Sequence, residues 1–230
     1  GSITSSVSAN TTAGFSIVTY TGTGSAATVG HGLGAVPQWL IVKNRGASAN
    51  WRVYHVYQGN TKAAALNSTS EQSVTDSGFW NNTTPTSSVF SIGSGYADST
   101  NASSNTYVAY CFAEKKGYSK FGNYTGNGNA EGVFVYTGFR PAWILFKRTS
   151  GTGNWQLLDD KRTGFNPENH TLYPNSDIAD QDETDANIFS NGFRLTNTGT
   201  DGNGSGDTYM YMAFAHSPLV NSKGVPNNAR

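Results

Sequence analysis

The residues of this chain that could do chemistry are few, and the run 201–207 is the first to consider. Asp201, Asn203 and Ser205 place side-chain oxygens at alternate positions, as in the first half of a calcium-binding loop. Position twelve of such a loop carries a bidentate glutamate, whereas this chain has Met212 there. We therefore interpret the run as a glycine-rich hairpin loop and predict no cofactor. The alternative is that Asp201, Asn203 and Ser205 bind a metal ion.

The histidines and the cysteine show no catalytic or metal-binding spacing. Neither an H-x-x-x-H nor a C-x-x-C pattern occurs, which argues against a zinc site. The histidines are expected at the surface or at sheet edges: His31, His55, His170 and His216. Cys111 is the only cysteine, so no intrachain disulfide can form. Its place in an apolar run predicts a small buried hydrophobe rather than a nucleophile.

The acidic side chains offer no carboxylate pair of the kind that glycosidases use. Their densest run predicts a solvated loop, with a metal site as the alternative: Asp177, Asp180, Asp182, Glu183 and Asp185. No acid occupies a repeated or aromatic-flanked position that would mark a sugar cleft. We therefore predict no catalytic residues and expect that the protein is not an enzyme.

Loop aromatics give the best indication of a ligand. Trp80 precedes a polar loop, and Tyr96 lies with Asp98 and Asn101 on another. Aromatic rings cover the apolar C–H faces of sugars, while amide and carboxylate groups bind the hydroxyls. We predict these four residues, Trp80, Tyr96, Asp98 and Asn101, as ligand-binding residues.

The chain contains two copies of one fold, and this fold must position these residues. The segments 20–24, 37–43 and 106–113 recur as 124–128, 141–147 and 208–215. The offset is 104 from Tyr20 to Trp51 and 102 near the end, so the intervening loops differ in length.

Alignment of the two copies assigns several side chains to packing. It pairs Trp39 with Trp143 and Trp51 with Trp155, which predicts core positions for all four tryptophans. It also pairs Cys111 with Ala213, His31 with Val135 and Trp80 with Phe189. Because Trp80 is paired with Phe189, the alternative to ligand binding is that Trp80 only closes the core.

Short β-rich runs bounded by Gly, Asn, Ser or Pro predict seven strands in each copy. The first set is 14–21, 26–31, 37–44, 51–57, 62–67, 88–93 and 105–114. The second set is 118–125, 131–137, 141–148, 154–159, 170–174, 192–196 and 207–216. This density predicts an all-β fold of two tandem β-sandwich, jelly-roll-like repeats of about 100 residues.

Strands 37–44 and 141–148 are apolar on both faces, which is typical of a central strand covered twice. The second apolar face of each strand is covered either by the other repeat or by a neighbouring subunit. Because no linker separates the repeats, we expect them to pack against each other.

Composition limits the partners. Lys plus Arg equals Asp plus Glu at 15, so the formal net charge of zero argues against nucleic acid. No run approaches the ~20 apolar residues of a membrane helix, and no signal peptide opens the chain. We expect four segments: an N-terminal lead-in at 1–13, β-sandwich repeats at 14–116 and 117–218, and a C-terminal tail at 219–230.

The segments 14–24, 29–34, 39–43 and 107–114 resemble a tandem β-repeat domain of tailed bacteriophages. That domain is found at the C-terminal end of tail-fibre and other virion structural proteins, and segment 221–230 resembles its C-terminus. The resemblance implies an exposed virion module, on the tail fibre or another exterior surface, that forms a homotrimer as many phage fibres do. It supplies no catalytic or binding residues.

Three functions are consistent with these observations. The first is a receptor-binding or adhesin module of a tail fibre that contacts bacterial cell-surface glycan without cleaving it. The second is a purely structural virion component, a capsid decoration or fibre assembly domain whose partners are other virion proteins. The third is a polysaccharide depolymerase, which lacks a visible acid pair.

Overall fold

The computed structural model describes residues 1–70, 77–94, 100–164 and 166–218. The chain divides into two compact units, the first formed by Gly1–Asn67 with Gln72–Glu114 and the second by Ser68–Glu71 with Lys115–Arg230. Almost every element is a strand and every pairing between strands is antiparallel, which confirms the predicted all-β sandwich class. None of the helices in the described ranges is long and apolar enough to span a bilayer.

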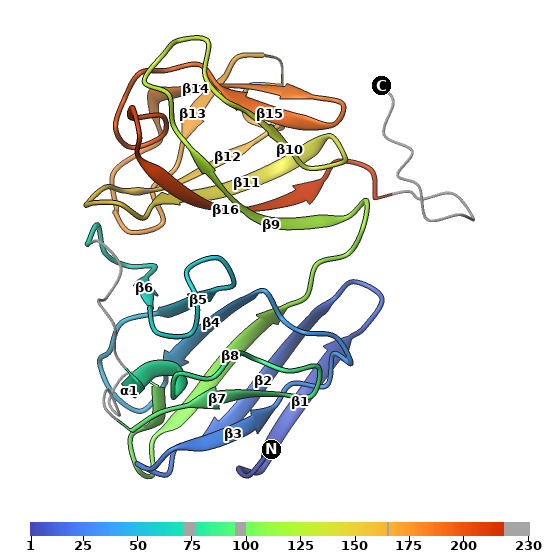
Figure 1. Ribbon diagram of the computed structural model, residues 1–230, viewed down its shortest axis with the longest axis vertical. Coiled ribbons are helices and arrows are strands. Elements are labelled where there is room, and N and C mark those ends of the chain that lie inside the picture. The colour runs from blue at the N-terminus through green and yellow to red at the C-terminus, as the bar shows by residue number, and fades with distance from the viewer. Residues whose placement is uncertain (71–76, 95–99, 165, 219–230) are drawn as a thin grey trace. The chain divides into compact units, whose positions relative to one another are not determined.

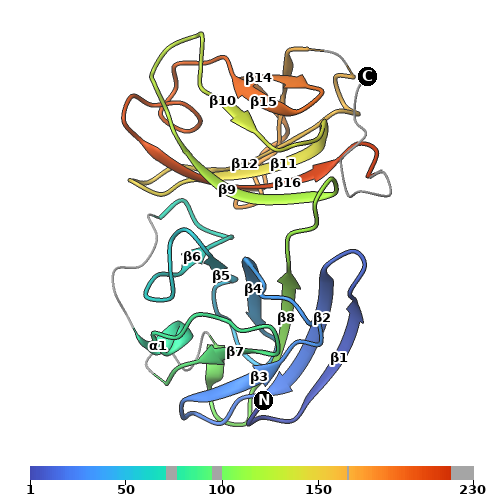
Figure 2. The ribbon, with the colours of Figure 1, turned by 45° about the vertical axis from the view of Figure 1, so that its right-hand side comes forward.

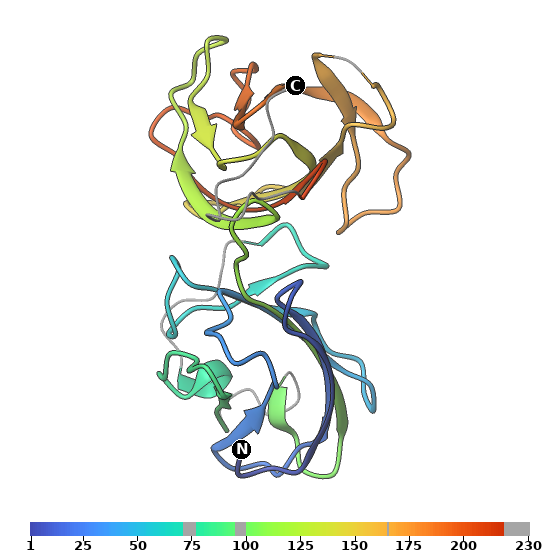
Figure 3. The ribbon, with the colours of Figure 1, turned by 90° about the vertical axis from the view of Figure 1, so that its right-hand side faces the viewer.

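The first unit is a sandwich of two unequal layers (Figure 1). Its large sheet has the order β1-β2-β8-β4-β5-β6, and a β3-β7 ribbon with the short helix α1 lies on its concave side (Figure 3). The bounds are β1 (Ser5–Asn10), β2 (Phe15–Thr21), β3 (Ala27–Gly30), β4 (Trp39–Asn44), β5 (Arg52–His55), β6 (Ala64–Ala65), α1 (Ser77–Trp80), β7 (Val89–Ile92) and β8 (Thr106–Phe112).

The second unit has two four-stranded layers (Figure 2). One has the order β12-β11-β16-β9 and the other β10-β15-β14-β13. The bounds are β9 (Ser119–Thr125), β10 (Phe134–Tyr136), β11 (Pro141–Arg148), β12 (Trp155–Asp159), β13 (Glu168–Thr171), β14 (Gln181–Phe189), β15 (Gly192–Leu195) and β16 (Thr208–Ala215).

The duplication is visible in the strand order. The central strands β2-β8-β4-β5 correspond to β9-β16-β11-β12, and the β3-β7 pair corresponds to β10-β15. Each of the fourteen predicted strands overlaps one of the observed strands. The additions are specific to one copy: β1 extends the first large sheet, while β13 and β14 extend the second layer of the second unit.

Two segments form strands where the sequence predicted none. Residues 5–10, assigned to a lead-in, pair along their whole length with β2. Most of the acidic run lies within β14 rather than in a solvated loop, so that prediction is wrong. Pairing with β13 and β15 supplies the backbone partners of β14, and Ala186 and Ile188 are buried in the core. Neither segment shows a clear alternation of apolar residues in sequence.

The four repeated tryptophans divide into two pairs by their burial. Trp39 and Trp155 are fully buried, as predicted, whereas Trp51 and Trp143 are only half-buried. Cys111 lies in the first core, and burial raises the pKa of its thiol to about 12, so it remains a protonated hydrophobe. The predicted packing role of Cys111 is therefore confirmed.

A stacked tyrosine pair joins the same two strands in each copy. Tyr20 stacks on Tyr107 with ring centroids 5.1 Å apart, and Tyr124 stacks on Tyr209 at 4.8 Å. The hydroxyl of Tyr20 donates to the carbonyl of Thr100, and the hydroxyl of Tyr124 donates to that of Gly202. Each pair thus fixes the loop that leads into the last strand of its unit.

A buried asparagine completes this arrangement. The side-chain oxygen of Asn101 accepts the backbone N–H of Thr23 at 2.8 Å, and that of Asn203 accepts the N–H of Asn127 at 3.0 Å. Their amide groups donate to neighbouring carbonyls, including Ser25 O at 2.6 Å in the first unit. Because both asparagines are fully buried, these bonds satisfy groups that have no access to water.

Replacing Asn203→Ala should lower the free energy of unfolding by about 1–3 kcal/mol, because it leaves the Asn127 N–H and loop carbonyls unpaired. Chemical denaturation measures the change. The matched control is Asn123→Ala, an exposed asparagine in β9, which should stay within about 0.5 kcal/mol of the wild type. Equal losses in both variants would contradict the proposed role of the buried asparagine.

Candidate functional site

Trp80, predicted to bind a ligand, lies at the end of α1 and is 1% exposed. Its indole N–H donates to the carbonyl of Lys62 at 2.9 Å, and its ring meets Tyr54 edge-on. Trp80 therefore closes the first core, the alternative that the sequence left open. Phe189, its predicted counterpart, is instead 37% exposed, so the two do not share a role.

The other predicted site residues do not form a ligand site in the described parts of the chain. The side-chain groups of Asn101 already hydrogen-bond to backbone groups of the neighbouring loops. Tyr96 and Asp98 lie outside the described residues. In the alternative metal set, the Asn203 oxygen already accepts a backbone N–H and Ser205 is exposed. Across the described ranges, no group of three His, Cys, Asp or Glu side chains is arranged to hold a metal ion.

Two of the four histidines are buried, which corrects the surface prediction for His31 and His55. Atom Nδ1 of His31 accepts the backbone N–H of Leu33 at 3.2 Å, and Nε2 lies 3.1 Å from the Thr86 carbonyl. Burial lowers the pKa of His31, and the hydrogen bond to Thr86 opposes this only in part. Backbone groups thus satisfy both nitrogens of this buried ring.

The remaining histidines meet carboxylates in the second unit. His170 Nδ1 lies 3.0 Å from Asp180 at the surface, and His216 contacts the buried carboxylate of Asp160. Glu168 is also buried, and burial is the main cause of its raised pKa. A general acid must reach a glycosidic oxygen, which a 1% exposed side chain cannot do.

Exposed aromatic rings gather on the outer surface of the β10-β15-β14-β13 sheet. We define the aromatic face as Phe134, Tyr136, Phe189, Gly192 and Arg194. The three rings are 44%, 65% and 37% exposed, while Val135 between the first two points into the core. Strand pairing places them side by side, because Arg194 is opposite Phe134 and Gly192 is opposite both Tyr136 and Phe189.

Contacts within the aromatic face hold it in shape. Phe134 meets Phe189 edge-on with centroids 5.7 Å apart, and the Arg194 guanidinium lies 5.9 Å from the Phe189 ring centroid. Arg194 also pairs with Glu131 at 2.6 Å, which adds a polar border. A Cβ on Gly192 would come within 2.8 Å of the Phe134 ring, so glycine lets that ring lie across the strand. Flat apolar surface with hydrogen-bonding groups beside it is suited to recognition.

The first unit shows that the fold does not require this aromatic face. Val29 pairs with Phe90 as Val135 pairs with Phe193, and each phenylalanine meets a stacked tyrosine edge-on at 6.3 Å. Val29 and Val135 are therefore equivalent, and the sequence alignment of Val135 with His31 was shifted by two residues.

The outer positions of the first unit differ accordingly. Thr28 and Gly30 stand where the second unit has Phe134 and Tyr136. The N-terminal residues occupy this surface, since the Ile3 N–H donates to the Thr28 carbonyl at 3.0 Å and Gly1 lies against Gly30. Correct alignment of the copies was the signal that could have revealed the aromatic face from sequence, and the slip concealed it.

The family assignment covers both units. A family model described as a domain of unknown function (DUF7483) matches residues 1–218, so the chain belongs to this family. No curated protein and no solved structure matches the chain.

The burial of His31 predicts a pH-dependent stability. The folded state lowers the pKa of His31 below its ordinary value of 6.5, so the unfolded chain binds the proton more readily. The free energy of unfolding should therefore fall as the pH decreases below about 6.5. Denaturation at pH 7.5, 6.5 and 5.5 measures this loss.

His31→Gln should flatten the decrease over this pH range, because glutamine does not titrate. His170→Gln serves as the control, since His170 is an exposed histidine, and it should retain the decrease. The same slope in the wild type and in His31→Gln would show that another group is responsible.

Proposed function

We propose that this protein is a non-catalytic module of a bacteriophage virion, the receptor-binding domain of a tail fibre. It binds bacterial surface glycan through the aromatic face of its second unit. The single observation that carries the binding role is the cluster of Phe134, Tyr136 and Phe189 exposed together on one sheet. Exposed aromatic clusters are costly in water and mark surfaces that bind a partner.

The composition of the aromatic face favours a sugar over a protein partner. Its rings can stack on the apolar faces of pyranose units, and Arg194 and Glu131 can bind hydroxyl groups at the border. A single site of this size binds weakly, so the homotrimer that the phage resemblance implies would raise affinity through multivalency. The virion location is supported by that resemblance in the repeated segments.

A purely structural virion component is the second candidate. The exposed aromatic face would then be an assembly surface for another virion protein. Removal of the domain would leave host adsorption unchanged in that case and would block particle assembly instead. A depolymerase would release reducing sugar from host capsule, which the non-catalytic proposal does not allow.

Tyr136→Ala should weaken glycan binding about tenfold, equivalent to about 1.4 kcal/mol, because it removes the most exposed ring of the aromatic face. A glycan array identifies the ligand, and calorimetry then measures the dissociation constant. Tyr136→Phe retains the ring and should bind within about threefold of the wild type, since the stacking surface is unchanged.

The control variant is Tyr57→Ala, which removes a tyrosine of the first unit that is 58% exposed. It should bind glycan as the wild type does. Equal affinities of Tyr136→Ala and Tyr57→Ala, with both proteins folded, would rule out the aromatic face as the binding site.

A further inference from the structure

A groove of about 240 Å³ lies at one end of the large sheet of the first unit. The starts of β1 and β8 and the ends of β2 and β4 border it. We name it the Arg45 groove. Each residue that lines it carries a polar side-chain group: Thr4, Ser5, Ser6, Thr19, Tyr20, Thr21, Arg45, Thr106 and Tyr107.

The polar groups of the Arg45 groove have unused hydrogen-bonding capacity. The Arg45 backbone N–H donates to the Thr106 carbonyl at 2.8 Å, which anchors the residue at the border. The Arg45 side chain is exposed, and its guanidinium bonds to none of the residues that the structure describes. Within the same ranges, five hydroxyls that line the groove also lack a side-chain partner: Thr4, Ser6, Thr19, Thr21 and Thr106.

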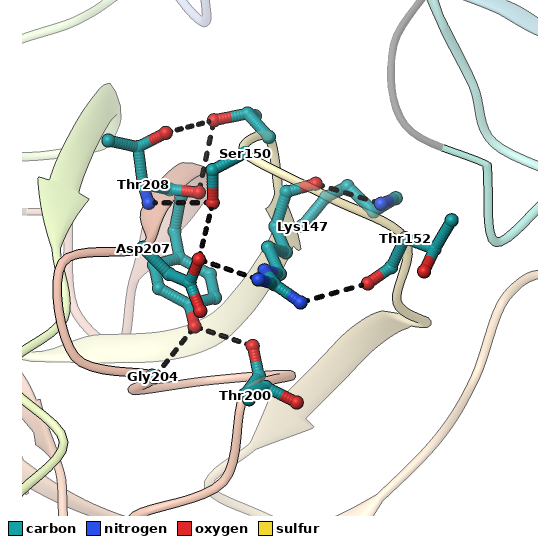
Figure 4. Close-up of polar contacts among 10 residues, drawn as sticks. Lys147, Ser150, Thr152, Thr200, Gly204, Asp207 and Thr208 are labelled. Carbon is teal, nitrogen blue, oxygen red and sulfur yellow. Dashed lines mark hydrogen bonds and ion pairs between the residues drawn. The ribbon is translucent and has the colours of Figure 1, made fainter.

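The second unit closes the same corner with an ion pair. Arg148 donates to the carboxylate of Asp207 at 2.6 Å, and Ser150 donates to the same oxygen at 2.8 Å. Figure 4 shows Ser150, Asp207 and Thr208 meeting at this point, with the Thr208 N–H donating to Ser150. Burial acts to raise the pKa of Asp207, but the bonds from Ser150 and Arg148 outweigh it and hold the pKa below 3.8.

The first unit has two asparagines where the second unit has this ion pair. Asn44 is paired with Tyr107 as Arg148 is paired with Tyr209, so Asn44 takes the place of Arg148. The carbonyl of Asn105 accepts the Gly22 N–H as that of Asp207 accepts the Gly126 N–H, so Asn105 takes the place of Asp207. Arg45 itself corresponds to Thr149, because the Arg45 N–H donates to the Thr106 carbonyl as the Thr149 N–H donates to the Thr208 carbonyl, so the second unit has no cation at this position.

We propose that the Arg45 groove binds an oxyanion, the carboxylate, sulfate or phosphate group of an acidic ligand. Arg45 supplies the charge, because a guanidinium presents a planar fork that matches such groups. The threonine and serine hydroxyls around it donate further hydrogen bonds. This site belongs to the first unit and does not depend on the aromatic face, so either site can fail without the other.

The proposal is tested by titrating four probes into the whole chain: sulfate, inorganic phosphate, glucuronate and glucose. Backbone amide signals in NMR spectra report the position of binding. Saturable shifts confined to β1, the end of β2 and the start of β8 are expected with the three anions and not with glucose. Tighter binding of glucuronate than of the free ions would identify an acidic sugar, whereas equal binding would identify the oxyanion alone as sufficient.

Two substitutions test the role of the charge. Arg45→Gln should weaken anion binding at least tenfold, whereas Lys116→Gln removes an exposed cation elsewhere and should change it less than twofold.

Three results would overturn the proposal: no saturable shift with any anion, equal effects of Arg45→Gln and Lys116→Gln, or equal binding of glucose and glucuronate. Tyr136→Ala should leave anion binding unchanged, since its residue belongs to the aromatic face. A loss of glycan binding in that variant with anion binding intact would separate the two sites.

Discussion

Both units depend on the stacked tyrosine pair that joins the first and the last of their shared strands. The rings of Tyr20 and Tyr107 lie nearly parallel at 10°, as do those of Tyr124 and Tyr209. Their hydroxyls hold the loop before the last strand, and the buried asparagine of that loop holds the hairpin opposite. Burial raises the pKa of Tyr209 to about 12, so its hydroxyl keeps the proton and retains its donor role.

The two surfaces proposed for recognition lie next to these tyrosine pairs. Phe193 meets Tyr124 edge-on, and its neighbours along β15 are Gly192 and Arg194 of the aromatic face. In the first unit, Tyr20 and Tyr107 themselves line the Arg45 groove. The shared core therefore sets the positions of both surfaces, while the residues that decorate them differ between the copies. Duplication allowed one copy to acquire exposed rings and the other an unpaired charge without altering the packing that both require.

The strands could be predicted because the repeat supplied two versions of each one. The second layer was less predictable, since the loop before β10 is longer than its counterpart and shifts Val135 by two residues against Val29. A shift of two keeps the core face and changes which outer residues correspond, so Phe134 and Tyr136 escaped comparison. Trp80 and Asn101 were misassigned for another reason. Their polar atoms are satisfied by backbone groups distant in sequence, and composition cannot reveal such bonds.

The buried titratable groups are separate from the groups that the two proposed surfaces present. His31 and Glu168 have the perturbed pKa values that acid–base chemistry uses, yet both are buried and neither lines the Arg45 groove. The groups that the two proposed surfaces present are mainly rings, hydroxyls and guanidinium groups, which bind without transferring protons. Only 13% of the residues are charged, so few competing salt bridges surround Arg45. The first unit therefore has a cation among neutral hydroxyls at Arg45, where its copy has Thr149.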